Sequence, residues 1–219
     1  MEKAVLTVFG RHESEKIIEK SRFLTYSAHV ESESEARAFL SEVKALHPFA
    51  THCCYAFVAD KAGNLQRFSD DGEPQGTAGI PILDVIKNKK LFETAAAVVR
   101  YFGGVKLGAG GLVRAYSSCT AENLAAAEIR SLEMCVEYSI EVEYPGADAA
   151  RKFISSQPCT LLSSDYGEGV TFRVAVKKSQ AGRFDEKLTD CMQGRVKISV
   201  NGEYYNAFHV QSHFYFTFS

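Results

Sequence analysis

The stretch "VVRYFGGVKLGAGGLVRAY", residues 98–116, joins an apolar run to a segment rich in glycine. The apolar run begins earlier, as "AAAVVRYF" at residues 95–102, and a nearly continuous run of this kind is typical of a buried strand. After the glycines, apolar residues recur at helical spacing from Leu112 to Ala127. The stretch therefore predicts a buried strand, a glycine loop and a long helix in direct succession.

The glycine loop is a candidate anion site. Free backbone N–H groups at the start of a helix attract anions, and glycine lets a phosphate approach the backbone closely. The sequence lacks the GxxxxGK pattern of a phosphate-binding loop, and "GAGGLV" stops short of the dinucleotide fingerprint. A tight turn and close packing of the helix against the sheet are therefore the alternative explanation for the glycines, and on physical grounds alone the favoured one. The candidate anion or nucleic-acid binding residues are Arg100, Gly103, Gly104, Lys106, Gly108, Gly110, Gly111 and Arg114.

An arginine within an apolar strand needs a carboxylate partner or an open cleft. The nearest acidic cluster lies in the polar loop "DDGEPQGTAG", residues 70–79. We expect Arg100 to contact Asp70, Asp71 or Glu73, either as a structural clamp between two loops or as part of a functional cleft. These carboxylates are also hard oxygen ligands of the kind that Mg²⁺ prefers, but the sequence places no nucleophile or general base beside them. Neither a metal nor a cofactor is predicted.

The region before this stretch reads as alternating strands and helices. Residues 22–30 are typical of a strand, and Ser32 followed by Glu35 is a capping box that predicts the start of a helix. Residues 52–59 and the segment "LQRFS" then form a predicted hairpin.

A second helix is predicted after the acidic loop. Thr77 is its expected N-cap, and "KNKK", residues 87–90, ends it with positive charge, as the helix dipole prefers.

The pattern restarts at Cys135 and predicts an α+β protein of two domains. Strand-like and helix-like segments follow one another as βαββαβ, the split βαβ or ferredoxin-like plan. The expected domains are residues 1–133 and 135–204, followed by an aromatic C-terminal tail over residues 205–219.

Composition restricts the function only loosely. A net charge of −2 gives no whole-chain attraction to nucleic acid, so a polyanion site has to be a local patch. No signal-peptide pattern and no apolar run long enough to span a membrane is found. The six cysteines form no CxxC pair and are expected to be reduced core thiols of a cytoplasmic protein.

Four motifs, in this order, resemble the Impact/YigZ family. They are "KSRF" (20–23), "HPFATHCCYAF" (47–57), "SDDGEPQGTAGIPIL" (69–83) and "VVRYFGGVKLGAGGLVRAY" (98–116). The resemblance implies a first domain like domain 2 of ribosomal protein S5 and a second domain like those of elongation factor G. Eukaryotic relatives regulate translation through a different N-terminal domain that this sequence lacks, so that activity is not carried over.

Three functions stay open on this basis. The first is a non-enzymatic, translation-associated module that binds RNA or ribosome-associated proteins through the glycine loop. The local basic residues proposed for it are Lys87, Lys89, Lys90, Arg100, Lys106 and Arg114. The second is an enzyme or binder acting on a phosphorylated small molecule or nucleotide at the same loop, and the third is an interaction protein with no small ligand. No membrane partner is expected, and the sequence does not define an oligomeric state.

Overall fold

β6 (Thr94–Tyr101) is the central strand of the first sheet, as its apolar sequence requires. In this computed structural model, which describes residues 5–209, every residue of β6 except the last is buried. β3 (Ser21–His29) and β4 (His52–Val58) pair with it on either side, both antiparallel. β2 (Arg11–Ile18) and β5 (Gln66–Ser69) form the edges, which gives the order β2-β3-β6-β4-β5.

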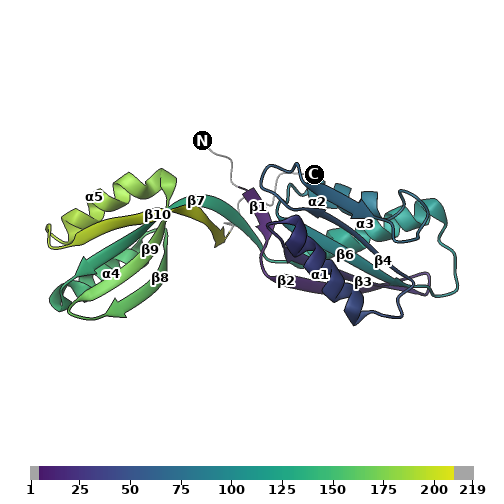
Figure 1. Ribbon diagram of the computed structural model, residues 1–219, viewed down its shortest axis with the longest axis horizontal. Helices are drawn as coiled ribbons and strands as arrows, with labels where there is room; N and C mark the ends of the chain where they lie inside the picture. The colour runs from purple at the N-terminus through teal and green to yellow at the C-terminus, as the bar shows by residue number, and fades with distance from the viewer. Residues whose placement is uncertain (1–4, 210–219) are drawn as a thin grey trace. The chain divides into compact units, whose positions relative to one another are not determined.

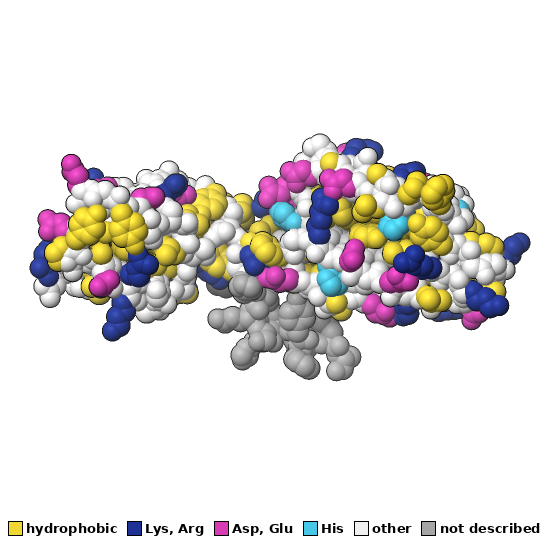
Figure 2. All heavy atoms as spheres, turned by 90° about the horizontal axis from the view of Figure 1, so that it is seen from below, with side chains coloured by type: hydrophobic (Ala, Val, Ile, Leu, Met, Phe, Trp, Pro, Cys, Tyr) yellow, Lys and Arg dark blue, Asp and Glu magenta, His cyan; other side chains and the backbone are white. Residues whose placement is uncertain are grey.

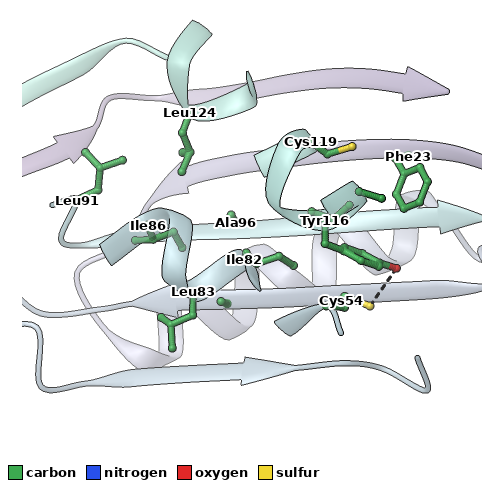
Figure 3. Close-up of a cluster of buried hydrophobic side chains, with 14 of the residues drawn as sticks. Phe23, Cys54, Ile82, Leu83, Ile86, Leu91, Ala96, Tyr116, Cys119 and Leu124 are labelled. Atoms are coloured by element: carbon green, nitrogen blue, oxygen red, sulfur yellow. Dashed lines mark hydrogen bonds between the residues drawn. The ribbon is translucent and has the colours of Figure 1, made fainter. Parts of the chain in front are cut away.

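Helices cover both faces of this sheet (Figure 1). α1 (Glu33–Leu46) packs on one face against side chains such as Cys53 and Val99. α2 (Gly79–Asn88) and α3 (Gly108–Ala126) pack on the other face, where Cys54 lies near Tyr116 in the cluster drawn in Figure 3. The adjacent cysteines therefore point into opposite cores, as a strand requires.

Two strands near the N-terminus are not foreseen by the sequence. β1 (Val5–Val8) bridges to the segment before β6 through Leu6 and Leu91, and β2 pairs with β3 along its whole length. β2 alternates exposed and half-buried residues, and it is largely polar on both faces. Because it buries no apolar face, it lacks the periodic signal from which a strand is predicted.

The predicted helix starts are right for α1 and wrong in detail for α2. Ser32 Oγ accepts a hydrogen bond from Glu35 N at 3.2 Å, which confirms the capping box. Thr77 does not cap α2, because its hydroxyl donates to the carbonyl of Pro74 at 2.6 Å. The Asp70 carboxylate accepts from the first N–H groups of that helix instead.

The second sheet has the predicted βαββαβ element order. Its strands β10 (Lys197–His209), β7 (Ile129–Val142), β9 (Val170–Lys177) and β8 (Cys159–Tyr166) lie side by side in that order. β7 also pairs with β1. Short 3₁₀ turns at Tyr144–Gly146 and Lys178–Gln180 precede the two helices. The elements are β7 (Ile129–Val142), α4 (Ala147–Ser156), β8 (Cys159–Tyr166), β9 (Val170–Lys177), α5 (Ala181–Cys191) and β10 (Lys197–His209).

Alternate residues of β7 and β9 form the second core. Ile140 and Phe172 are paired across the two strands and are fully buried. α4 and α5 cover this face with residues such as Ile154 and Leu188.

The chain divides into two compact units, which are described separately. The first extends to Ser131, and the second comprises Leu132–Phe208. The division falls within β7, close to the predicted boundary at residue 134, so a continuous strand and not a loop crosses it. β10 continues past the predicted domain end into the first part of the aromatic tail, and residues 210–219 of that tail lie outside the described residues.

Within residues 5–209, no helix has both the length and the apolar character needed to cross a membrane.

Separate cores predict separate responses to core mutations. Phe172→Ala removes a fully buried ring and is expected to destabilise the second unit by about 3–5 kcal/mol. Hydrogen exchange followed by mass spectrometry should show lost protection in peptides from residues 132–208 only. Ile82→Ala, at an equally buried position in the first unit, is the matched control and should give the reverse pattern. An equal loss of protection in both units after either substitution would contradict two independent cores.

Candidate nucleic-acid interface

A buried ion pair joins the acidic loop to the central strand. Arg100 Nη1 donates to Glu73 Oε1 at 2.6 Å, and both side chains are about 95% buried, with exposed fractions of 5% and 4%. The arginine side chain also lies near the rings of Phe23 and Phe102, 5.4 and 5.5 Å from their centroids. The expected contact between Arg100 and the acidic loop is thus confirmed, with Glu73 as the partner.

Hydroxyl groups from two other elements complete this pair. Tyr116 of α3 donates to the same Glu73 oxygen at 2.9 Å, and Arg100 Nη2 donates to Ser21 Oγ at 3.2 Å. His52 Nε2 lies 3.9 Å from the other Glu73 oxygen. The Glu73 carboxylate therefore links the acidic loop to β6 and α3. Arg100 links the same group to the start of β3 through Ser21.

The cysteines beside this network are poor nucleophiles. Burial raises the pKa of the Cys54 thiol well above its usual range, and burial together with the Asp71 carboxylate raises the pKa of Cys53 to about 11. Burial also raises the pKa of Tyr116, whose hydroxyl lies 3.4 Å from Cys54 Sγ. Because a thiolate is the reactive form of cysteine, this protonated cluster is structural.

The other two acidic residues of the loop bind backbone groups. Asp70 accepts from the N–H groups of Gly76, Ala78 and Gly79 at 2.8–3.0 Å. Burial alone would raise the pKa of Asp70, but these three donors hold it below its usual value. Asp71 Oδ2 accepts from the Cys53 N–H at 2.6 Å. Both carboxylates therefore stabilise the conformation of the acidic loop through hydrogen bonds to backbone N–H groups.

The glycine loop begins against the turn between β2 and β3. A Cβ at Gly103 would lie 1.9 Å from the carbonyl oxygen of Lys20, so only glycine fits this position. The Gly103 N–H lies 3.3 Å from Ser21 Oγ, the hydroxyl that also binds Arg100. Packing thus explains the first glycine of the loop.

Two of the later glycines, Gly104 and Gly108, face open space, whereas a Cβ at Gly111 would lie 3.1 Å from the Leu107 side chain. Gly104 and Gly108 have φ angles of +85° and +68°, and a Cβ on either would meet nothing within 4 Å. α3 begins at Gly108, four residues before the predicted apolar start at Leu112, and no side chain among residues 5–209 caps it. Its first N–H groups therefore face outward without a side-chain acceptor, in contrast to those of α2.

Two exposed cations lie in the glycine loop and the first turns of α3, and two exposed aromatic rings lie on segments that meet at the end of β6. Lys106 and Arg114 are exposed, and neither has an ion-pair partner among residues 5–209. Arg114 Nη1 lies 3.6 Å from where a Cβ of Gly110 would be. Phe102 directly precedes the loop and is 46% exposed, whereas Phe49 is 89% exposed. The segment after Phe49 is bonded to the end of β6 through Thr51, whose N–H donates to the Arg100 carbonyl at 2.8 Å.

The predicted basic cluster is not one patch. Residues 87–90 end α2 and lead into the start of β6, whereas the glycine loop follows its end. A strand of eight residues separates the two sites by about 20 Å or more. On the face seen in Figure 2, Lys and Arg side chains are interspersed with Asp and Glu, without a continuous basic surface.

A hollow of about 940 Å³ lies in the second unit. It is lined by the ends of β7, β8 and β9 and by several carboxylates, such as Glu143 and Glu168, together with Arg195 and Lys197. Cys191 also lines it, but among the described residues no hydrogen bond pairs this thiol with a base, and Lys197 is already bound to Glu141 at 3.0 Å. The glycine loop remains the better candidate site.

Comparison with known proteins places this arrangement in a family. The Impact N-terminal domain model matches residues 19–124, and a domain of unknown function, DUF1949, matches residues 140–195. IMPACT family member YvyE of Bacillus subtilis is 36% identical over 192 residues, which are 88% of each chain. IMPACT family member YigZ of Escherichia coli is 37% identical over 183 residues, 83% of this chain and 90% of the relative.

The chain belongs to the IMPACT family. An IMPACT family member of Thermus thermophilus is 40% identical and is covered over 99% of its length. A solved crystal structure described as that of a hypothetical protein is 34% identical, with a TM-score of 0.60, and the match covers 90% of this chain and 97% of that one.

The residues of the IMPACT motifs fall into a buried group and an exposed group. Arg100, Gly103 and the three acidic residues shape the site from within, while the loop from Gly104 to Arg114 forms its surface. The binding of an anion by these residues stays a prediction. Sequence reasoning missed Ser21 and Tyr116, which complete the ion pair, although both lie within the quoted motifs. It also missed Phe49 and Phe102, since exposure decides their role.

The close approach at Gly103 predicts a strong contrast between two glycines of this IMPACT loop. Gly103→Ala must displace the β2–β3 turn and is expected to cost several kcal/mol, on the order of 3 kcal/mol. Gly110→Ala lies in a helix with room for a methyl group and should stabilise the fold by up to about 1 kcal/mol. Urea unfolding of both variants measures the difference. Similar stabilities would show that the loop relaxes around Gly103.

The three bonds to Asp70 predict a pH-dependent contribution to stability. Because its pKa is lowered on folding, the stabilisation is complete above the unfolded value near 3.8 and is lost as the pH falls below it. Asp70→Asn should reduce the free energy of unfolding by about 2 kcal/mol at neutral pH. Urea unfolding from pH 7 to pH 2 should show the difference from the unsubstituted chain shrinking below about pH 4. A difference that stays constant over this range would contradict the role of the ionised carboxylate.

Proposed function

We propose that this protein is a non-enzymatic, translation-associated regulatory protein that binds single-stranded RNA at the start of α3. The IMPACT family relationship supports the connection with translation. The observation that carries the proposal is a helix start with exposed glycines and no side-chain cap among residues 5–209. It is accompanied by two exposed cations without an ion-pair partner in that range and by two exposed phenylalanine rings on segments that meet at the end of β6.

Phosphate is the group that fits the helix start. The first N–H groups of α3 point outward at the positive end of the helix dipole, where a phosphate is stabilised. Gly104 and Gly108 leave the approach open. Lys106 and Arg114 add charge on either side, and Arg100 acts beneath them by holding Ser21 and thereby the loop.

Exposed aromatic rings favour unpaired bases over a duplex. Bases of a single strand stack on aromatic side chains, and each such contact contributes about 1–3 kcal/mol. Phe49 and Phe102 lie on segments that meet at the end of β6, where Phe102 N donates to Thr51 Oγ1 at 3.0 Å. The two aromatic rings and the proposed phosphate-binding groups therefore lie at the same end of the first unit.

Further features are consistent with this proposal. The element orders of the two units support the proposed likeness to domain 2 of ribosomal protein S5 and to the ferredoxin-like domains of elongation factor G. Free cysteines, several of them buried, suit a reducing cytoplasmic setting. A nucleotide or another phosphorylated small molecule is the second candidate ligand, because the same helix start would hold its phosphate.

The charges at the helix start provide the test. Lys106→Ala with Arg114→Ala should weaken binding of a fluorescent oligoribonucleotide and lower the slope of log affinity against log salt by about 1.4, since each phosphate contact contributes about 0.7. Phe49→Ala should weaken binding about tenfold with little change in slope. Fluorescence anisotropy at several salt concentrations measures both effects.

The matched control is Lys87→Ala with Lys89→Ala, which removes the same charge from the far end of α2. It should leave RNA affinity nearly unchanged. Absence of RNA binding by the unsubstituted chain at low salt would refute the proposal. A rise in melting temperature with nucleotides in that case would favour the small phosphorylated ligand.

A further inference from the structure

We propose that His29, Glu31 and Glu93 form a binding site for one divalent transition-metal ion, for which Zn²⁺ is the best match. One ligand atom from each residue lies within 4.8 Å of the other two. His29 Nε2 is 3.1 Å from Glu31 Oε1 and 4.0 Å from Glu93 Oε2. This site lies at the opposite end of β3 and β6 from the glycine loop and is independent of the RNA proposal.

The backbone fixes the three residues relative to one another. His29 ends β3 and is paired with Thr94, the first residue of β6, so Glu93 is its diagonal neighbour. The Val30 N–H donates to the Glu93 carbonyl at 2.8 Å. Glu31 directly precedes the N-cap of α1, and its N–H donates to the Glu35 carboxylate at 2.8 Å.

Hydrogen bonds orient the imidazole of His29 as a ligand. Its Nδ1 lies 2.8 Å from Thr7 Oγ1, and that hydroxyl donates to the Glu93 carbonyl at 3.1 Å. The Thr7 oxygen is therefore placed to accept a hydrogen bond from the Nδ1–H, which leaves the Nε2 lone pair directed at the two carboxylates. Metal-binding histidines usually donate their other ring N–H in this way.

The buried carboxylate of Glu93 needs a second cation. Its side chain is 3% exposed, and Oε1 accepts from Lys61 Nζ at 2.7 Å. Oε2 is buried and has no hydrogen-bond partner among the described residues, although it faces the imidazole. A proton on Nε2 would satisfy Glu31 at 3.1 Å but would leave Glu93 Oε2 too far away for a hydrogen bond. A metal ion can bind all three atoms at once.

The ligand set indicates the kind of ion. Zn²⁺ binds imidazole nitrogen at about 2.0–2.1 Å and carboxylate oxygen at about 2.0–2.2 Å, so tetrahedral ligand atoms lie about 3.4 Å apart. The observed separations of 3.1 and 4.0 Å require only small side-chain movements. An imidazole disfavours Mg²⁺ and Ca²⁺, which prefer oxygen ligands alone. Glu31 is 60% exposed, which leaves the fourth position open to water.

Zinc titration tests the site directly. The chain carrying Cys191→Ser, which removes the exposed thiol, is freed of metal and titrated with Zn²⁺ against a chromophoric chelator. We expect one equivalent to bind, and His29→Ala, Glu31→Gln or Glu93→Gln each to weaken the affinity by at least about tenfold. Zn²⁺ should also raise the melting temperature, and less so in the variants.

Matched controls are His12→Ala and Glu13→Gln, the same residue types on β2 of the same sheet, which should bind Zn²⁺ as the Cys191→Ser chain does. Glu31→Gln keeps the result decisive if the buried variants fail to fold, because Glu31 is largely exposed. Equal affinity in Glu31→Gln and the controls would overturn the proposal, as would failure of the Cys191→Ser chain to bind at a large excess of Zn²⁺. Lys106→Ala with Arg114→Ala should not alter metal binding, which separates this test from the RNA test.

Discussion

The buried pair of Arg100 and Glu73 is the interaction on which the first unit depends. Removing two charges from water is costly, and the cost is offset only when the geometry is good and the remaining polar atoms find partners. Here Glu73 accepts from both Arg100 and Tyr116, and Arg100 also binds Ser21, while Arg100 Nε is buried without a hydrogen-bond partner among the described residues. Loss of either charge would leave the other buried without its partner, which typically costs about 3–5 kcal/mol. The pair therefore holds a strand, a helix and a loop to one arrangement.

This constraint extends to the surface through short links. Ser21 lies between the arginine and the Gly103 N–H, and Gly103 in turn rests against the Lys20 carbonyl. The position of the glycine loop is thus set by a buried charge, while its outer residues make few contacts of their own. Because buried contacts hold the loop in position, its surface groups stay available for a ligand. A site held in place in this way is preorganised, which reduces the free-energy cost of binding.

α2 and α3 both begin at the end of the sheet where β6 ends, and their first N–H groups differ in their hydrogen-bond partners. Asp70 accepts from the first N–H groups of α2, whereas α3 has no acidic residue in its first turn and no side-chain cap from the described part of the chain. An uncapped start forgoes roughly 1 kcal/mol of stability. Glycines at the same position weaken the helix further. The first turn of α3 is therefore built at the expense of local stability, which is the pattern expected where an outside ligand supplies the missing acceptor.

Sequence reasoning predicted those elements that carry a local signal. The apolar run of β6, the capping box of α1 and the βαββαβ order of the second unit all follow from spacing or composition and are confirmed. β2 was missed because it buries no apolar face, and the first turn of α3 was missed because glycine disfavours helix. Family motifs identified the region of the candidate site, although not the roles of its residues.

The sequence by itself determined that Arg100 needs either a carboxylate partner or an open cleft, and that the glycines adjoin a helix. Only the tertiary structure decided that Glu73, and neither Asp70 nor Asp71, provides the carboxylate, because the turn of the loop assigns the aspartates to backbone donors. It also separated the lysines of residues 87–90 from the loop, since α2 and β6 carry them to the other end of the sheet. Strand pairing likewise brought His29 beside Glu93 across a long interval of sequence. Spacing along the chain describes neighbours within one element, whereas register between strands decides which distant side chains meet.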